Sequence, residues 1–168
     1  MGCSTGRLLL DLPYKNVKIG YDIATLLPEE KNEENNCVFA YKDLNKYFTI
    51  RNACLVYSIF TMQFLKREAR RNYIENIYNG LTTGSAFILT EKIYQEDGKI
   101  QEIMAFSHYD YKCKSFTEEE IIKKERDLRF IMKPNTLKEI LEMLESARFS
   151  KVSTFWQSFN FIGIIAIK

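Results

Sequence analysis

The sequence predicts one α/β domain whose mostly parallel sheet ends in an antiparallel hairpin. Apolar runs of strand length alternate with segments of helical periodicity along most of the chain, a pattern typical of parallel sheets. Residues 53–60 form an apolar run of the kind found in strands buried on both faces. Residues 152–159 and 161–167 are two predicted strands separated only by Asn160, so they must pair antiparallel. A chain of 168 residues is long enough to enclose its own core.

The first third of the chain is predicted to contain short elements. Residues 7–12 have the pattern of a short helix, and residues 17–21 that of a short strand. Pro28 and the polar stretch 29–36 predict a short helix and a loop. Residues 37–41 form a second short apolar run, which is expected to be the next strand.

The middle of the chain predicts a helix between two buried strands. Residues 66–81 follow the strand at 53–60 and have helical spacing, Gly84 is expected to end the helix, and residues 86–89 form the next strand. The apolar side chains of the helix recur every four residues, at Ala69, Tyr73, Ile77 and Leu81.

The last third predicts two more helices before the closing hairpin. Thr117 and Glu120 have the spacing of a capping box, which opens a helix to about Met132. Pro134 interrupts the chain, and residues 137–144 then carry apolar side chains at helical spacing. Because no repeat and no linker is visible, residues 1–168 are predicted to be a single domain.

Composition excludes several classes of protein. A net charge of +2 argues against a dedicated DNA-binding module. The four cysteines form no CxxC pair and His108 is the only histidine, so neither a metal site nor a disulfide framework is expected. The apolar run at 159–167 is too short to span a bilayer. A cytoplasmic protein with reduced thiols and no membrane contact is therefore expected.

Two features near the N-terminus favour a nucleoside ligand. Residues 2–6 are small and precede a helical run, where backbone N–H groups can approach a ligand closely. Asp22 ends the first predicted strand, a position from which an acid hydrogen-bonds ribose hydroxyls in nucleotide-binding α/β units. Alone, such a glycine segment is usually a turn and such an acid a helix cap. Their order and spacing together favour the nucleoside.

Several other residues have a functional and a structural interpretation. Asp43 follows the next strand and either meets an adenine amino group or is a loop carboxylate. Residues 58–61 are expected to face the ligand, because ligands bind at the carboxyl ends of strands. Residues 123–126 are either a solvated helix face or include an arginine that pairs with a carboxylate. His108 and Trp156 lie among aromatic residues and are expected to pack in the interior.

Five short motifs of the chain match those of a known family. They are GCS at residues 2–4, FTMQFL at 60–65, IYNGL at 77–81, TEK at 90–92 and FWQSFNF at 155–161. They are similar to GCS, FTLQFL, IYxGL, SEK and WFQCFNF of the carboxy-S-adenosylmethionine synthase family, an offshoot of the class I methyltransferases that use S-adenosylmethionine. The resemblance implies a Rossmann-like class I methyltransferase sheet with its C-terminal antiparallel hairpin.

The resemblance also implies a reaction and partners. Members of the family bind S-adenosylmethionine, take a carboxyl group from prephenate, and release carboxy-S-adenosylmethionine and phenylpyruvate. Deprotonation of the sulfonium methyl gives an ylide, which captures the carbon dioxide lost by prephenate without a metal. A second enzyme uses the product on a wobble uridine of tRNA, so no direct contact with tRNA is expected here. A cytoplasmic homodimer is implied.

Matching the family residue by residue gives an expected site. Gly2, Cys3 and Ser4 would line the methionine and ribose side of the cofactor. Asp22 would hold the ribose, beside Ile23 where the family often has Asn. No residue is assigned as a catalytic base.

The remaining matches fall on later elements. Asp43 and Leu44 would meet the adenine. Arg126 matches the arginine that pairs with the added carboxylate if one gap is allowed, whereas without a gap the position falls on Glu125, which would repel a carboxylate. Ile59 stands where the family has an Asn that contacts the cofactor.

The resemblance begins inside the glycine loop. The family's N-terminal helical segment and the strand leading into that loop are expected to be missing, which makes 1–168 a domain incomplete at its N-terminus. The strands starting near residues 17 and 53 would face each other across a gap. On its own such a chain is expected to be neither stable nor active, because unpaired strand edges are costly.

Two other interpretations stay open at this stage. The chain could be a plain S-adenosylmethionine-dependent methyltransferase, or a degenerate remnant that binds no ligand. Arg126 separates the first from the synthase: a carboxylate bound there favours the synthase, and an open acceptor pocket favours methyl transfer.

Overall fold

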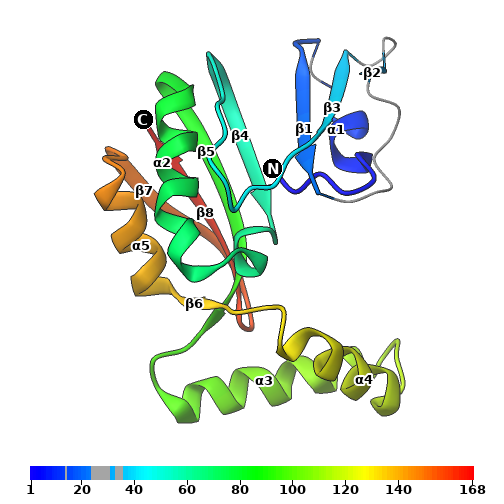
Figure 1. Cartoon of the computed structure of the whole chain (residues 1–168). Helices are drawn as coiled ribbons and strands as arrows, with labels where there is room; N and C mark the ends of the chain where they lie inside the picture. Colours follow the sequence, from blue (N-terminus) through cyan, green and yellow to red (C-terminus); the bar gives the residue numbers. More distant parts are fainter. Residues whose placement is uncertain (14, 24–30, 33–35) are drawn as a thin grey trace.

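The computed structural model describes residues 1–13, 15–23, 31–32 and 36–168, which form two neighbouring sheets (Figure 1). The first sheet has the strand order β1-β3-β2 and the second β4-β5-β8-β7, with β6 paired to β5 off this path. The strands are β1 (Lys18–Asp22), β2 (Lys31–Asn32), β3 (Cys37–Tyr41), β4 (Ala53–Ile59), β5 (Leu81–Tyr94), β6 (Asn135–Thr136), β7 (Lys151–Ser158) and β8 (Phe161–Ile167).

The pairing confirms the predicted fold class. β1 pairs parallel with β3, and β4 pairs parallel with β5. β8 runs antiparallel to both β5 and β7, so the chain ends in the expected hairpin. The turn of this hairpin places Phe159 at φ 48° and buries Asn160. An α/β fold with the closing hairpin is therefore shown, but its strands are mixed and not mostly parallel, because β2 also pairs antiparallel with β3.

The strands β1 and β4 belong to different sheets, and the start of the chain lies between them. The Met1 amino group donates to the Tyr57 carbonyl at 2.7 Å. The N–H groups of Gly2 and Cys3 both donate to the Tyr21 carbonyl, at 2.8 and 3.1 Å. In the described part of the chain these two strands are not paired with each other, and residues 1–3 hydrogen-bond to the backbones of both.

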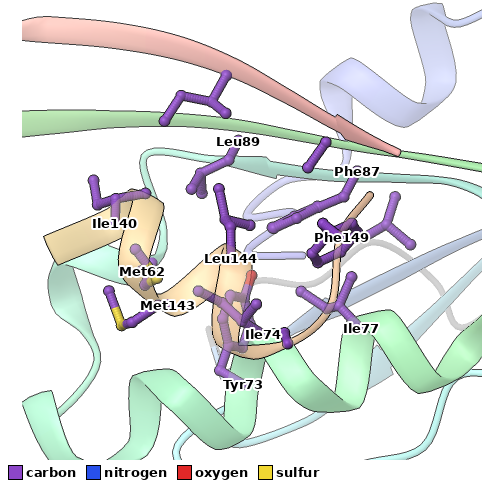
Figure 2. Packing of buried hydrophobic residues seen from close by; sticks show 14 of the residues in the cluster. Met62, Tyr73, Ile74, Ile77, Phe87, Leu89, Ile140, Met143, Leu144 and Phe149 are labelled. Atoms are coloured by element: carbon purple, nitrogen blue, oxygen red, sulfur yellow. The ribbon is translucent and has the colours of Figure 1, made fainter. Parts of the chain in front are cut away.

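The main core lies between the second sheet and two helices, α2 (Arg70–Gly80) and α5 (Leu137–Ser146). Figure 2 shows their apolar side chains meeting those of β5. Apolar side chains buried together stabilise the fold in proportion to the area that they remove from water. The most deeply buried members include Tyr73, Ile74, Ile77, Phe87, Leu89, Ile140 and Leu144.

The helices α3 (Gly98–Lys112) and α4 (Glu118–Arg129) form an arm beyond the end of β5 (Figure 1). The predicted capping box of Thr117 and Glu120 opens α4, with the Glu120 N–H donating to the Thr117 hydroxyl at 3.3 Å. The arm joins the sheet through Glu125, whose carboxylate lies 3.7 Å from Lys92 Nζ and 3.6 Å from Lys112 Nζ. Among the described helices, which also include the short α1 (Arg7–Asp11), none combines the length and apolar character of a membrane span.

Two predicted boundaries are wrong around α2. The helix begins at Arg70, after two short 3-10 turns at Met62–Phe64 and Arg67–Ala69. It ends at Gly80 and not at Gly84, because β5 starts at once with Leu81. Gly84 instead lies inside β5 at φ 79°, a left-handed conformation that glycine adopts without strain.

Two further predictions are corrected. The polar stretch 29–36 lies mostly outside the described residues, as does Pro28, and its described part, Lys31–Asn32, is a strand paired antiparallel with β3. Trp156 is 42% exposed and does not pack in the core, because β7 is the end strand of its sheet. His108 packs as expected, with its ring 5.2 Å from those of both Phe159 and Phe161.

Candidate functional site

A pocket of about 400 Å³ opens at the carboxyl ends of β1, β3 and β4. This volume lies within the range of small-molecule sites, and the carboxyl ends of parallel strands are where α/β sheets bind ligands. Both sheets contribute to the pocket. Its lining consists of Gly2, Ser4, Asp22, Ile23, Lys42, Asp43, Leu44, Asn45, Ile59, Phe60, Thr61, Phe64 and Leu65.

The glycine segment and the end of β1 form one wall of the pocket. Asp22 is the last residue of β1, and its Oδ2 accepts the Ser4 N–H at 2.7 Å. Gly2 adopts φ 64°, and a Cβ atom there would clash with the Thr61 side chain. A side chain at position 2 would therefore be both strained and without space, so glycine allows the close approach of this backbone to the pocket.

The end of β3 forms a second wall, built around Asp43. Its Oδ1 accepts the backbone N–H of Asn45 at 3.0 Å and the side-chain amide of Asn45 at 3.1 Å. These bonds hold the pKa of the Asp43 carboxyl below its usual value, with a smaller contribution from Lys46 at 3.9 Å. The carboxylate is thus ionised at neutral pH and can accept a hydrogen bond from a ligand amino group.

The turn after β4 forms the third wall, and it is largely apolar. Phe60 adopts φ 50°, which turns the chain sharply away from the strand. Ile59, Phe60 and Thr61 line the pocket from this turn, and Phe64 and Leu65 continue the surface. A site with two carboxylates on one side and apolar side chains on the other fits a ligand that has both a hydroxylated sugar and a flat ring.

The structure brings together most of the residues predicted from the sequence. Those that line the pocket are Gly2, Ser4, Asp22, Ile23, Asp43, Leu44 and Ile59. Cys3 does not line it: its side chain lies against Gly20, and burial raises the pKa of its thiol. The sequence could place Cys3 in the glycine segment but could not tell which side its thiol faces.

Arg126 is not brought to the pocket. It is exposed on α4, and Figure 1 shows that helix at the opposite end of the molecule from β1 and β3. Glu125, the alternative at this position, also lies outside the pocket, in contact with Lys92 and Lys112. The carboxylate-pairing role expected for position 125 or 126 is therefore not met within a single chain.

Sequence reasoning missed four lining residues. Lys42 and Asn45 flank Asp43, so their position next to a predicted ligand contact was the available signal. Phe64 and Leu65 belong to the FTMQFL motif, whose first two residues were expected to face the site. Within the described ranges, no three His, Cys, Asp or Glu side chains are close enough together to hold a metal ion.

Two solved structures with a similar fold are described as methyltransferases. Human N-acetylserotonin methyltransferase in complex with S-adenosylmethionine superposes over all of this chain and 46% of its own, with a TM-score of 0.67 and 17% identity. A possible histamine N-methyltransferase of Thermotoga maritima superposes with a TM-score of 0.63 and 14% identity, over 100% of this chain and 79% of its own. At these identities the likeness shows the class I methyltransferase fold.

Sequence comparison identifies closer relatives, although no family model matches the chain. Carboxy-S-adenosyl-L-methionine synthase of Staphylococcus epidermidis is 37% identical over 176 aligned positions, which cover 100% of this chain and 77% of the relative. The enzyme of the same name from Shewanella halifaxensis is 44% identical over 120 positions, 71% of this chain, and there the match spans about half (49%) of the relative. With its five motifs, its fold and these relatives, the chain belongs to the carboxy-S-adenosyl-L-methionine synthase family.

Proposed function

We propose that the chain binds S-adenosylmethionine in the pocket and converts it to carboxy-S-adenosylmethionine, with prephenate as the carboxyl donor and phenylpyruvate as the second product. One observation carries the proposal. The Ser4 N–H of the glycine segment donates a hydrogen bond to Asp22, and both residues line the pocket. The name shared by the relatives favours this reaction over plain methyl transfer.

The pocket residues supply the contacts that such a ligand needs. The Asp22 carboxylate would accept hydrogen bonds from the two ribose hydroxyls, and an ionised acceptor makes these bonds stronger than neutral ones. Asp43 accepts from the adenine amino group, and Leu44 packs against the ring. The backbone at Gly2 and Ser4 lines the remaining side, which would take the methionine part of the ligand.

The proposed reaction needs no metal, because the positive sulfur stabilises the carbanion that forms beside it. The sulfonium methyl loses a proton, and the resulting carbanion bonds to the carbon dioxide that leaves prephenate. Prephenate also loses hydroxide as its ring becomes aromatic, and this hydroxide and the methyl proton together make water. Residues of the pocket orient the methyl group and exclude bulk water during these steps.

A homodimer is proposed because Arg126 lies outside the pocket of its own chain. Arg126 can meet the added carboxylate only if the pocket of a second copy approaches α4. The arm offers apolar surface for such pairing, since exposed patches of this kind mark interfaces. Its most exposed large apolar side chains are Ile103, Phe106, Tyr111, Phe116, Ile122, Phe130 and Ile131.

The proposed product places the chain in tRNA modification. A second enzyme would transfer the carboxymethyl group to a wobble uridine, so the chain itself needs no contact with tRNA or a membrane. We place it in the cytoplasm, where prephenate and tRNA are both available.

The proposal is tested by the product. The protein is incubated with S-adenosylmethionine and prephenate, and mass spectrometry should find S-adenosylmethionine carrying one added carboxyl group, together with phenylpyruvate. Reactions without prephenate, and reactions of the Asp22→Ala variant, serve as controls and should give little product. Formation of S-adenosylhomocysteine with a methylated acceptor, and no carboxylated product, would support the plain methyltransferase instead.

Replacing Ile59 with Asn is expected to tighten binding of S-adenosylmethionine. Ile59 lines the pocket at the end of β4, where its apolar side chain offers neither a donor nor an acceptor, whereas Asn offers both. One added neutral hydrogen bond of about 1 kcal/mol corresponds to roughly fivefold in the dissociation constant. Calorimetry measures the change, with Ile59→Leu as the matched apolar control. If Asn binds no better than Leu, the ligand does not reach position 59.

A further inference from the structure

The TEK motif at residues 90–92 contains a buried carboxyl group that the proposed binding contacts do not use. Glu91 is on β5, at the level where β4 ends, and is 1% exposed. It does not line the pocket. A buried ionisable group that makes no contact with a ligand needs another explanation, because burial of such a group costs free energy unless it is hydrogen-bonded.

Glu91 holds the turn that forms the apolar wall of the pocket. Its Oε1 accepts the N–H of Met62 at 2.9 Å and the N–H of Thr61 at 3.2 Å. These two residues follow Phe60, whose φ of 50° reverses the chain. Since the residues just after a sharp turn have no strand partner, the Glu91 carboxyl replaces the hydrogen bonds that a sheet would give them.

The neighbours of Glu91 in the motif support the same turn. The Thr90 carbonyl accepts the Phe60 N–H at 2.8 Å, and the Lys92 N–H donates to Gln63 Oε1 at 2.8 Å. Three consecutive residues of β5 thus bind the consecutive residues 60–63. Two of these contacts use the backbone of β5, and only the contact from Glu91 depends on a side chain of the motif.

The turn at residues 60–62 also fixes the position of the glycine segment. The Thr61 hydroxyl donates to the Met1 carbonyl at 3.1 Å and packs so closely on Gly2 that no Cβ fits between them. A shift of Thr61 would therefore move the backbone at Gly2, which lines the adjacent wall of the pocket. Glu91 acts on both walls through this one residue.

We propose that Glu91 is a positioning residue for the S-adenosylmethionine pocket: it locks the turn at residues 60–62 and, through Thr61, the glycine segment. This inference rests on the proposed function for the identity of the ligand. The lock itself is a property of the free chain and can be measured without any ligand.

Burial raises the pKa of Glu91 to about 8, against smaller opposing effects of the Met62 N–H and of Arg70. Besides Arg70, the titratable group Tyr73 also faces Glu91 from α2. Burial raises the pKa of Tyr73 as well. In the folded chain Glu91 is therefore protonated at neutral pH, whereas in an opened turn it would ionise readily. Between the ordinary carboxyl pKa of 4.5 and about 8, the closed turn holds a proton that the opened turn has lost, so the lock weakens as the pH rises over this range and changes no further above it.

The experiment compares wild type with Glu91→Gln across about pH 5 to 9, which spans the ordinary and the raised pKa of the Glu91 carboxyl. The amide resembles the protonated acid in shape, keeps the acceptor oxygen and cannot ionise. Glu96→Gln, the same change at an exposed position between β5 and α3, is the control. Two quantities are measured: the dissociation constant for S-adenosylmethionine, and the hydrogen-exchange rates of the amides at residues 61–65 in the free protein.

Relative to Glu91→Gln, wild type and Glu96→Gln should lose up to about tenfold in affinity for each pH unit between about 5 and 8, the limit for release of one proton, and should lose no more above about 8. Exchange at residues 61–65 should be faster in wild type than in Glu91→Gln at pH 8 and above, and this difference should shrink towards pH 5. In Glu91→Leu, which removes the acceptor, the amides at residues 61–65 should exchange faster than in wild type at every pH. The Met1 amino group, whose pKa burial lowers to about 6, titrates in the same way in every variant, so the difference between wild type and Glu91→Gln isolates Glu91.

Equal pH profiles for wild type and Glu91→Gln, in binding or in exchange, would overturn the proposed role of Glu91. If Glu91→Leu fails to fold, the comparison with Gln still decides the question. Failure of wild type to bind S-adenosylmethionine at any pH would overturn the proposed function. The exchange data would then decide separately whether Glu91 locks the turn.

Discussion

Replacing Asp22 with Ala is expected to weaken S-adenosylmethionine binding by about 10- to 100-fold. The variant loses the acceptor for the two ribose hydroxyls, and charge-assisted hydrogen bonds contribute about 1.5–3 kcal/mol. It also loses the acceptor of the Ser4 N–H, which lies 2.7 Å from the carboxylate in the free chain. The glycine segment keeps its bonds from Gly2 and Cys3 to the Tyr21 carbonyl but loses its anchor at Ser4, so both the ligand contact and the shape of the wall are affected. Calorimetry with the purified variant measures the effect.

Two further variants separate these contributions. Asp22→Asn keeps an acceptor oxygen for the Ser4 N–H but removes the charge, so we expect an affinity between those of wild type and Ala. Asp11→Ala removes an exposed carboxylate at the end of α1, which lies 3.9 Å from Arg7, and should bind like wild type. An unchanged affinity in Asp22→Ala would show that the nucleoside lies elsewhere.

Replacing Phe87 with Ala is expected to lower the free energy of unfolding by about 3–5 kcal/mol, the range for removing a large aromatic side chain from a core. Phe87 is fully buried in the middle of β5. Its ring stacks on that of Phe149, with 5.9 Å between the centroids, and Figure 2 shows it among the side chains between the sheet and its helices. The loss is a large part of the about 5–15 kcal/mol that stabilises a typical domain.

Denaturant unfolding followed by circular dichroism measures this change. Tyr47→Ala is the matched control, because Tyr47 is an aromatic residue that is 78% exposed, and surface changes usually stay within about 0.5 kcal/mol. A similar small effect for Phe87→Ala would mean that the core between β5, α2 and α5 is not the main source of stability.

Much of the fold could be predicted because its signals are local. The runs at 37–41, 53–60 and 161–167 became β3, β4 and β8 because continuous apolar segments of that length are buried in sheets. Thr117 opens α4 through a capping box that needs only four residues of sequence. The closing hairpin followed from connectivity alone, since two strands joined by so short a turn have one way to pair.

What could not be predicted depends on contacts between distant residues. Trp156 is exposed because β7 is the end strand of its sheet. The sequence of β7 alone does not determine the order of the strands. The continuation of β5 through Gly84 follows from its partners on both sides, β4 and β8. In the pocket, Asp22 and Asp43 could be found from their positions at strand ends. The distance of Arg126 from them became visible only when α4 was placed in space.

The division of the strands into two sheets has a consequence for how the chain opens. Units of a protein that share few backbone hydrogen bonds can unfold separately, each with its own free energy. The β1-β3-β2 sheet supplies Asp22 and Asp43 to the pocket, and the other sheet supplies Ile59 and Phe64. A ligand held by all four would act as a non-covalent cross-link, and its binding free energy would be added to the cost of separating the sheets. Ligand binding and cooperativity of unfolding would then be two measures of the same coupling.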